Sequence, residues 1–219
     1  MKLLYLDCFA GICARRLLGA LLAVGAEKEK INLGFDTLLG DGAVQVQTAD
    51  TERSGFPSVC ASLVVRHGFD PAANPLPSSV QKWMDAVTCK LDCPTPTEWV
   101  TLLGVYLALE QLKVQEVVCS PLCEGGAPHP ITQALSDQGA IVLRRSDCGF
   151  PLITSLGAAL AATLPARFGA MPEMDITAIG YGAGAAEWDG VPNVVRAVTG
   201  EQGNLFDRML EEALFEAAK

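Results

Sequence analysis

A carboxylate and a thiol stand side by side directly after the first apolar run of the chain. Asp7 ends the segment 1–7, which reads as a buried strand, Cys8 follows it, and Gly11 comes three residues later. Ligands of α/β proteins bind at the carboxyl ends of strands, beside the N-terminus of the following helix. Asp7 and Cys8 are therefore predicted to be catalytic. The alternative is that Asp7 only caps the helix.

Three glycines stand at every second position further along the chain. Gly180, Gly182 and Gly184 follow an alternating apolar run, so one face of the predicted strand carries no side chains. Glycine weakens a strand and usually marks a bulge or the close approach of another backbone or a ligand. The backbone around these glycines, including Tyr181, is predicted to form a ligand cradle together with Asn193.

Thr154 precedes a helical segment and offers a hydroxyl and free backbone N–H groups to a phosphate. The alternative is an ordinary helix cap. Gly157, inside that helix, predicts close packing. The chain has two histidines, His67 and His129, which are too few for a metal site that needs several imidazoles.

Eight cysteines are spread irregularly along the chain, and the N-terminus carries no export signal that we recognise. Reduced thiols and a cytoplasmic location are therefore expected. Cys89 and Cys93, and likewise Cys119 and Cys123, form Cys-x-x-x-Cys pairs. Four such thiolates could bind zinc in a small thiolate metal protein, although Cys-x-x-Cys is the usual spacing. The alternative is that these cysteines are core residues.

The composition indicates a globular protein and excludes some classes of partner. The chain has 219 residues, of which half are hydrophobic, and 16 Lys and Arg stand against 25 Asp and Glu. Such a chain is globular, and its acidic balance argues against nucleic acid or an anionic membrane as a partner. The apolar runs are too short to span a membrane. The same composition allows a homo-oligomer as well as a monomer.

The order of apolar and polar residues predicts a mixed arrangement of strands and helices. Strands are expected at 1–7, 44–48, 58–66, 114–119, 140–143, 174–180 and 194–198, and helices at 13–24, 78–90, 98–112, 131–138, 154–164 and 204–218. The expected fold class is α+β (a mixed α/β sandwich), a sheet with helices packed on it. Residues 1–201 are expected to form one domain, followed by a C-terminal helix over 202–219.

Four blocks of the sequence resemble the LarC family, the nickel-insertion family of nickel-pincer cofactor synthesis. They are 4–12 with 18–22, 104–112 with 120–122, 157–160, and 171–201, the last of which contains Gly180, Asn193 and Arg196. The resemblance implies nickel insertion into pyridinium-3,5-bisthiocarboxylic acid mononucleotide, a CTP-dependent reaction of a cyclometallase of the lyase type. It also implies nickel and a nucleotide-like small molecule as ligands.

The chain departs from the family pattern at four places. An Ile-Ser-Gly-Asp-Met segment is replaced by 12–16, which puts Arg15 at a carboxylate position. A His-x-His-Glu segment and its following Asp are replaced by 95–101, a Thr-Pro-Thr-Gly segment by 154–157, and a His-rich loop by 65–74. Arg15 is predicted to bind a phosphate or a carboxylate where the family would bind a cation.

The lost side chains are mostly ones that could bind a metal, so sulfur ligands would have to replace them. The predicted metal ligands are Cys8, Cys13, Cys119 and Cys123. The C-terminal domain that we associate with nucleotide binding in the family has no counterpart here, so CTP with a divalent metal would require a partner chain that supplies it. The alternative is a non-catalytic family member that acts as a binding or scaffold protein.

Overall fold

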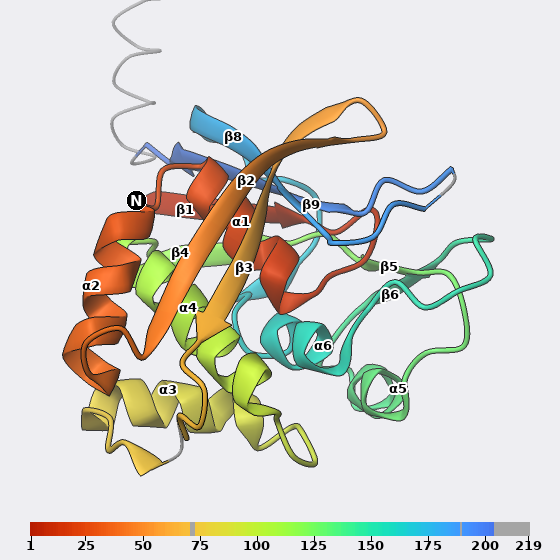
Figure 1. Cartoon of the computed structure of the whole chain (residues 1–219). Coiled ribbons are helices and arrows are strands. Elements are labelled where there is room, and N and C mark those ends of the chain that lie inside the picture. Colours follow the sequence, from red (N-terminus) through yellow and green to blue (C-terminus); the bar gives the residue numbers. More distant parts are fainter. Residues whose placement is uncertain (71–72, 189, 204–219) are drawn as a thin grey trace, which may run out of the picture.

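A mixed sheet forms the centre of the molecule. The computed structural model describes residues 1–70, 73–188 and 190–203. The strands of the main sheet are β1 (Lys2–Asp7), β2 (Val44–Arg53), β3 (Phe56–Val65), β4 (Glu116–Cys119), β7 (Arg167–Phe168), β8 (Asp175–Ala183) and β9 (Val194–Glu201). Their order is β2-β3-β8-β9-β1-β4-β7 (Figure 1). Two further strands, β5 (Leu122–Glu124) and β6 (Leu143–Arg145), pair in parallel beside the main sheet.

Helices cover one face of this sheet. They are α1 (Ala14–Ala23), α2 (Lys28–Leu39), α3 (Ser78–Thr88), α4 (Pro96–Leu112), α5 (Pro130–Asp137) and α6 (Ser155–Ala161). The first helix, α1, lies across the middle of the sheet, and α2, α4 and α6 surround it (Figure 1). The expected mixed α/β fold, a sheet with helices packed on it, is confirmed.

The helix starts follow from local sequence. Thr95 caps α4 by accepting a hydrogen bond from the Glu98 backbone, and the Glu98 side chain accepts one from the Thr95 backbone. This reciprocal pair is a capping box, and Pro96 in the first turn adds a fixed φ at no hydrogen-bond cost. Lys113 ends α4 in the left-handed conformation. The predicted helix over 98–112 is therefore confirmed with an earlier start.

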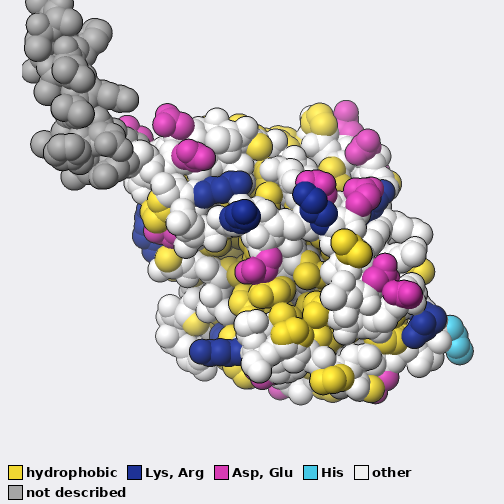
Figure 2. All heavy atoms as spheres, turned by 90° about the vertical axis from the view of Figure 1, so that its left-hand side faces the viewer, with side chains coloured by type: hydrophobic (Ala, Val, Ile, Leu, Met, Phe, Trp, Pro, Cys, Tyr) yellow, Lys and Arg dark blue, Asp and Glu magenta, His cyan; other side chains and the backbone are white. Residues whose placement is uncertain are grey.

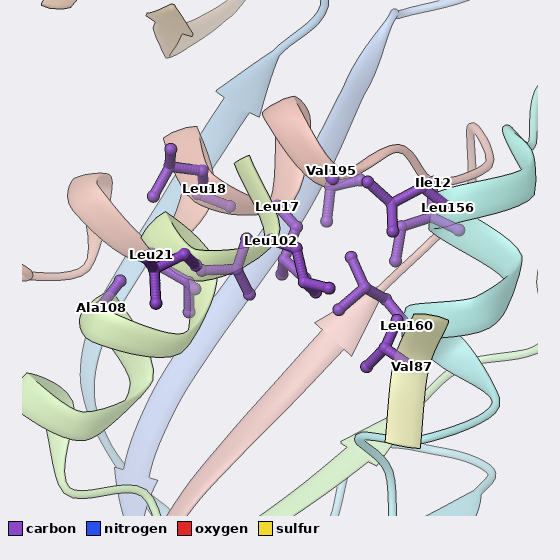
Figure 3. Close-up of a cluster of buried hydrophobic side chains, with 14 of the residues drawn as sticks. Ile12, Leu17, Leu18, Leu21, Val87, Leu102, Ala108, Leu156, Leu160 and Val195 are labelled. Carbon is purple, nitrogen blue, oxygen red and sulfur yellow. The ribbon is translucent and has the colours of Figure 1, made fainter. Parts of the chain in front are cut away.

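One large apolar core lies between the helices and the sheet. Leu17, Leu18 and Leu21 of α1 meet Leu102 and Ala108 of α4 on one side of it (Figure 3). On the other side Ile12, Val195, Val87, Leu156 and Leu160 close the cluster (Figure 3). A second, small cluster of Tyr5, Val118 and Val198 lies apart from it. Alternate residues of β1 therefore belong to two different layers.

Some predicted elements need correction. No helix or strand was predicted for the segment that forms α2. The buried side chains of this helix are Ile31, Phe35 and Leu39. The stretch between the predicted strand 114–119 and the predicted helix 131–138 contains β5, and the strand expected at 140–143 lies instead at Leu143–Arg145. The strands expected at 44–48 and 58–66 are confirmed as β2 and β3, which pair antiparallel and are longer than expected. The predicted C-terminal helix over 204–218 falls outside the described residues.

Charges of both signs are interspersed on the face that carries α2, and hydrophobic side chains gather in its lower part (Figure 2). In the described part of the chain, no helix combines the length and the hydropathy that a membrane span needs.

Candidate functional site

The carboxyl end of β1 lies in the interior of the sheet, between β9 and β4. Side chains alternate along a strand, so the two predicted catalytic residues point to opposite faces. Cys8 joins the core on the helical face and is fully buried. Asp7 lies on the other face, where its side chain is 18% exposed.

On that face Asp7 is bound to an arginine. Asp7 pairs with Arg196 of β9, whose Nη2 donates to Asp7 Oδ2 at 2.5 Å. Arg196 in turn lies opposite Tyr181 of β8. Burial lowers the pKa of the Arg196 guanidinium, but the effects of Asp7 and Tyr181 are larger, so the pKa is raised above its ordinary value. Two predicted site residues, Asp7 and Tyr181, are thus joined through Arg196, to which the sequence reading gave no role.

An aromatic row continues from Tyr181. The ring of Tyr181 lies 5.0 Å from that of Phe56, between centroids, and Phe56 lies 5.9 Å from Phe9. These spacings are those of stacked or tilted aromatic pairs. The sequence offered no periodic signal for this row, because its members come from three distant segments.

The helical face of the same strand end carries two thiols in contact. Cys8 Sγ lies 3.7 Å from Cys119 Sγ, and both residues are fully buried. The backbone N–H of Cys8 donates to Ser120 Oγ at 2.9 Å. The hydrogen bond with Cys119, and then burial, raise the pKa of the Cys8 thiol well above its ordinary value. A metal ion that bound here would have to displace the thiol protons.

The sulfur atoms of the other two predicted metal ligands, Cys13 and Cys123, have no contact with this pair among the described hydrogen bonds. Cys123 is buried, and its backbone N–H donates to Cys8 O at 3.1 Å. Cys13 caps α1, and its Sγ accepts from Arg16 Nε at 3.4 Å. Across the described residues, no three His, Cys, Asp or Glu side chains come together as a metal site would require. Nor do the two Cys-x-x-x-Cys pairs combine, since Cys89 and Cys93 are exposed while the other pair is buried.

Two buried charges flank the loop that follows β6. Arg16 is 1% exposed and donates to Ala10 O at 2.6 Å and to Leu152 O at 2.7 Å. Glu124, also buried, accepts from Leu152 N–H at 2.7 Å, while its Oε2 lacks a partner among the described residues. Leu152 therefore links the two charges through its own backbone. The sequence contains no pattern that would single out either charge as buried.

A pocket of about 170 Å³ unites three segments at which the chain departs from the LarC pattern. Its lining comes from the starts of α1, α4 and α6, and consists of Cys13, Ala14, Arg15, Thr97, Glu98, Thr101, Thr154 and Leu156. Thr154 also caps α6, because its Oγ1 accepts from Gly157 N–H at 3.1 Å. Gly157 packs closely, as predicted, since a Cβ there would lie 2.3 Å from Ile12 O.

The glycines of β8 face protein atoms rather than open space. A Cβ on Gly182 would lie 1.8 Å from Arg16 O, and one on Gly180 would lie 2.5 Å from Ala23 Cβ. The close approach is therefore made by α1. Gly184 instead leaves room for the side chain of Asn193, which donates to Ala186 O at 2.9 Å.

One side of the predicted cradle is nevertheless open. β3 and β8 pair only at Val59 with Gly182 and at Cys60 with Ala183, so the two parallel strands separate beyond that point. A cleft of about 450 Å³ lies between them, and Gly180 and Tyr181 line it.

Comparison with known proteins places the chain in a family. The nickel insertion protein family model matches residues 4–87 and 98–214 of the chain. A relative from Synechococcus sp., provisionally named a nickel insertion protein, is 28% identical over 92% of this chain and 61% of its own length. A similarly named relative from Geobacter metallireducens is 28% identical over the same shares.

A third relative carries a specific name. The pyridinium-3,5-bisthiocarboxylic acid mononucleotide nickel insertion protein of Geobacillus kaustophilus is 22% identical over 92% of this chain and 60% of its own length. The chain thus spans about three-fifths of the relatives that it matches. No solved structure is significantly similar to it. Because the family model covers most of the sequence, the chain belongs to the nickel insertion protein family.

Proposed function

We propose that the chain takes part in inserting nickel into pyridinium-3,5-bisthiocarboxylic acid mononucleotide, as the name of the Geobacillus relative describes for that protein. The observation that carries this proposal is the family match over 4–87 and 98–214. Nickel is then cargo that the protein receives and passes on. If the chain is catalytic, it acts as a CTP-dependent cyclometallase of the lyase type.

The sulfur pair at the end of β1 is our proposed point of nickel capture. Nickel favours imidazole and thiolate donors over hydroxyls, and Cys8 and Cys119 already have their sulfur atoms in contact. Cys13 and Cys123 are proposed as further ligands, and they would have to reorient to reach a shared ion. On the other face of the sheet, Asp7 would act by holding Arg196 rather than as a free base.

The organic ligand is proposed to bind at the pocket beside the helix starts and at the cleft between β3 and β8. Arg15 and Thr154 line the pocket at the helix starts, and a guanidinium there would hold a phosphate or carboxylate. Of the predicted cradle, Gly180 and Tyr181 line the cleft between β3 and β8 and are proposed to contact the ligand. Gly182, Gly184 and Asn193 are proposed to support it, because α1 and the Asn193 side chain occupy the space beside the two glycines. CTP and its divalent metal would be bound by a partner chain or by a region outside this sequence, since the relatives are longer.

Metal analysis tests the proposal directly. Untagged protein would be incubated with nickel or zinc, with and without CTP, and its metal content measured by mass spectrometry. Stoichiometric nickel that Cys119→Ser removes and Cys93→Ser leaves unchanged supports capture at the sulfur pair, because Cys93 is exposed and lies in another segment. Nickel bound equally by both variants would overturn the assignment of the ligands.

A second candidate is a binding or scaffold protein that keeps the family fold without its chemistry. It is favoured by the lack of any three-ligand group in the described part of the chain and by Arg15 at a carboxylate position. The same metal analysis separates the two, because this candidate predicts no bound metal in any condition.

A further inference from the structure

The strand β2 is the outermost strand of the main sheet on one side, beyond β3 (Figure 1). It pairs with β3 in continuous register from Val44 to Arg53, so no bulge interrupts it. Its sequence contains neither Pro nor Lys. Bulges, Pro and Lys are common devices that keep a sheet edge from pairing with another strand. The outer side of β2 is therefore a long and regular edge that lacks these three devices.

The hydrogen bonds of Asn32 show which backbone groups of β2 point away from β3. Asn32 Oδ1 accepts from Val46 N–H at 2.7 Å, and Asn32 Nδ2 donates to Val46 O at 3.5 Å. In an antiparallel pair the N–H and C=O of one residue point to the same side, and the side alternates along the strand. The N–H and C=O groups of Thr48, Asp50 and Glu52 therefore also point outward.

The middle of this edge has no hydrogen-bond partner in the described part of the chain, whereas its two ends are engaged. Asn32 binds one end, and at the other end Arg53 Nη1 donates to Glu52 O at 2.9 Å. No hydrogen bond between described residues uses the outward N–H or C=O of Thr48 or Asp50. Both residues are exposed, so another strand could reach these groups.

A second copy of β2 fits the unpaired groups. In an antiparallel pairing centred on Ala49, Thr48 of each copy lies opposite Asp50 of the other. Because both residues direct their backbone groups outward, each such pair exchanges two hydrogen bonds, and the two pairs use every unpaired group of both residues. Ala49, which is exposed and small, lies opposite its own counterpart on the twofold axis.

The neighbouring registers are less favourable. A pairing centred on Asp50 would place two carboxylates directly opposite each other. A pairing centred on Thr48 would require the outward groups of Val46, which Asn32 already binds. We propose that two copies of the chain join through their β2 edges, antiparallel and centred on Ala49, into one continuous sheet. This interface goes beyond the proposed nickel chemistry and does not depend on it.

Analytical ultracentrifugation of the metal-free chain tests the interface over about 1 to 300 µM, because a short ladder makes a small and weak contact. Ala49→Lys places two ammonium groups opposite each other and should weaken the dimer about tenfold or more. Thr48→Pro removes an outward N–H, which an edge strand tolerates, and should abolish the dimer while circular dichroism stays unchanged. Ala134→Lys is the matched control at an exposed position of α5 and should leave the dimer unchanged.

Disulfide cross-linking tests the register, in a background in which the exposed Cys89 and Cys93 are replaced by Ser. In Ala49→Cys the two new thiols form a pair without backbone hydrogen bonds, where the Cα atoms lie about 4.5 Å apart and a disulfide can form. Oxidised glutathione should therefore link Ala49→Cys into a covalent dimer. It should not link Gln47→Cys, which would lie opposite Thr51. A chain that is monomeric at every concentration, a dimer that Ala49→Lys leaves intact, or equal cross-linking of both cysteine variants would overturn the proposal.

Discussion

Asp7 and Arg196 lie opposite each other on neighbouring antiparallel strands, with 2.5 Å between Asp7 Oδ2 and Arg196 Nη2. Both side chains are partly shielded from water, since Asp7 is 18% and Arg196 is 36% exposed. Arg196 also reaches Tyr181 on the next strand. The carboxylate at the end of β1 therefore orients an arginine and a tyrosine across three strands.

Asp7→Asn should lower the free energy of unfolding by about 1 to 3 kcal/mol, because it leaves the partly buried Arg196 without its charged partner. Urea denaturation followed by circular dichroism measures the loss. Asp50→Asn, at an exposed position of β2, is the matched control and should change stability little. Equal stability of both variants would mean that the Asp7 pair contributes nothing to the fold.

Gly182→Ala should destabilise the protein by about 3 kcal/mol or prevent folding, because the new methyl group would meet Arg16 O and Ala20 N of α1. Gly169→Ala is the control, since the nearest atom to a Cβ there is Arg167 Nη1 at 3.9 Å. Thermal unfolding and soluble yield distinguish the two. A Gly182→Ala protein as stable as Gly169→Ala would show that α1 does not rest on β8 as described.

The stability of the metal-free protein should decrease at alkaline pH because of Cys8. Its pKa is raised in the folded state, through Cys119 and burial, above the ordinary value of 9.0. The unfolded chain therefore loses this proton first, and the stabilisation that is complete below about pH 9 disappears as the pH rises further, by up to about 1.4 kcal/mol per pH unit. Urea denaturation between pH 8 and 10, under reducing conditions, measures the slope. Cys8→Ala should flatten it, whereas Cys93→Ala should not.

Arg15→Asp should weaken the binding of an anionic mononucleotide about tenfold and reduce its dependence on salt, because the cation in the pocket is reversed. Nicotinic acid mononucleotide serves as a stable pyridinium probe in calorimetry at two ionic strengths. Arg15→Lys keeps the charge and should lose less affinity. If Arg15→Asp binds the probe with unchanged affinity and salt dependence, Arg15 does not contact the ligand.

Local patterns predicted much of the fold. The alternation over 58–66, the capping residue Thr154 and the long apolar helix ending at Leu112 all predicted elements that the structure contains. The helix α2 was missed because only three of its side chains are buried and its sequence carries a glycine in the middle. The two-residue strand β7 has no sequence signal of its own, since pairing with β4 defines it.

The candidate site was less predictable, because its groups meet through long-range packing. Asp7 and Cys8 were found from their place after a strand, yet their partners Arg196 and Cys119 lie more than one hundred residues away. The glycines of β8 correctly indicated a close approach, but spacing alone could not tell a helix backbone from a ligand. The pocket that joins Cys13, Arg15 and Thr154 depends on three helix starts that only the tertiary fold brings together.

The contact between α1 and β8 has a mechanical consequence. Gly19 and Gly182 bring the helix and the strand together backbone to backbone, with 3.1 Å between a Cβ on Gly19 and the Gly182 Cα. Where two elements meet without intervening side chains, neither can slide past the other without breaking main-chain contacts. The helix α1 is therefore a fixed wall of the site. A movement that admits or releases a ligand is expected from the facing segments, such as the turn at Arg53.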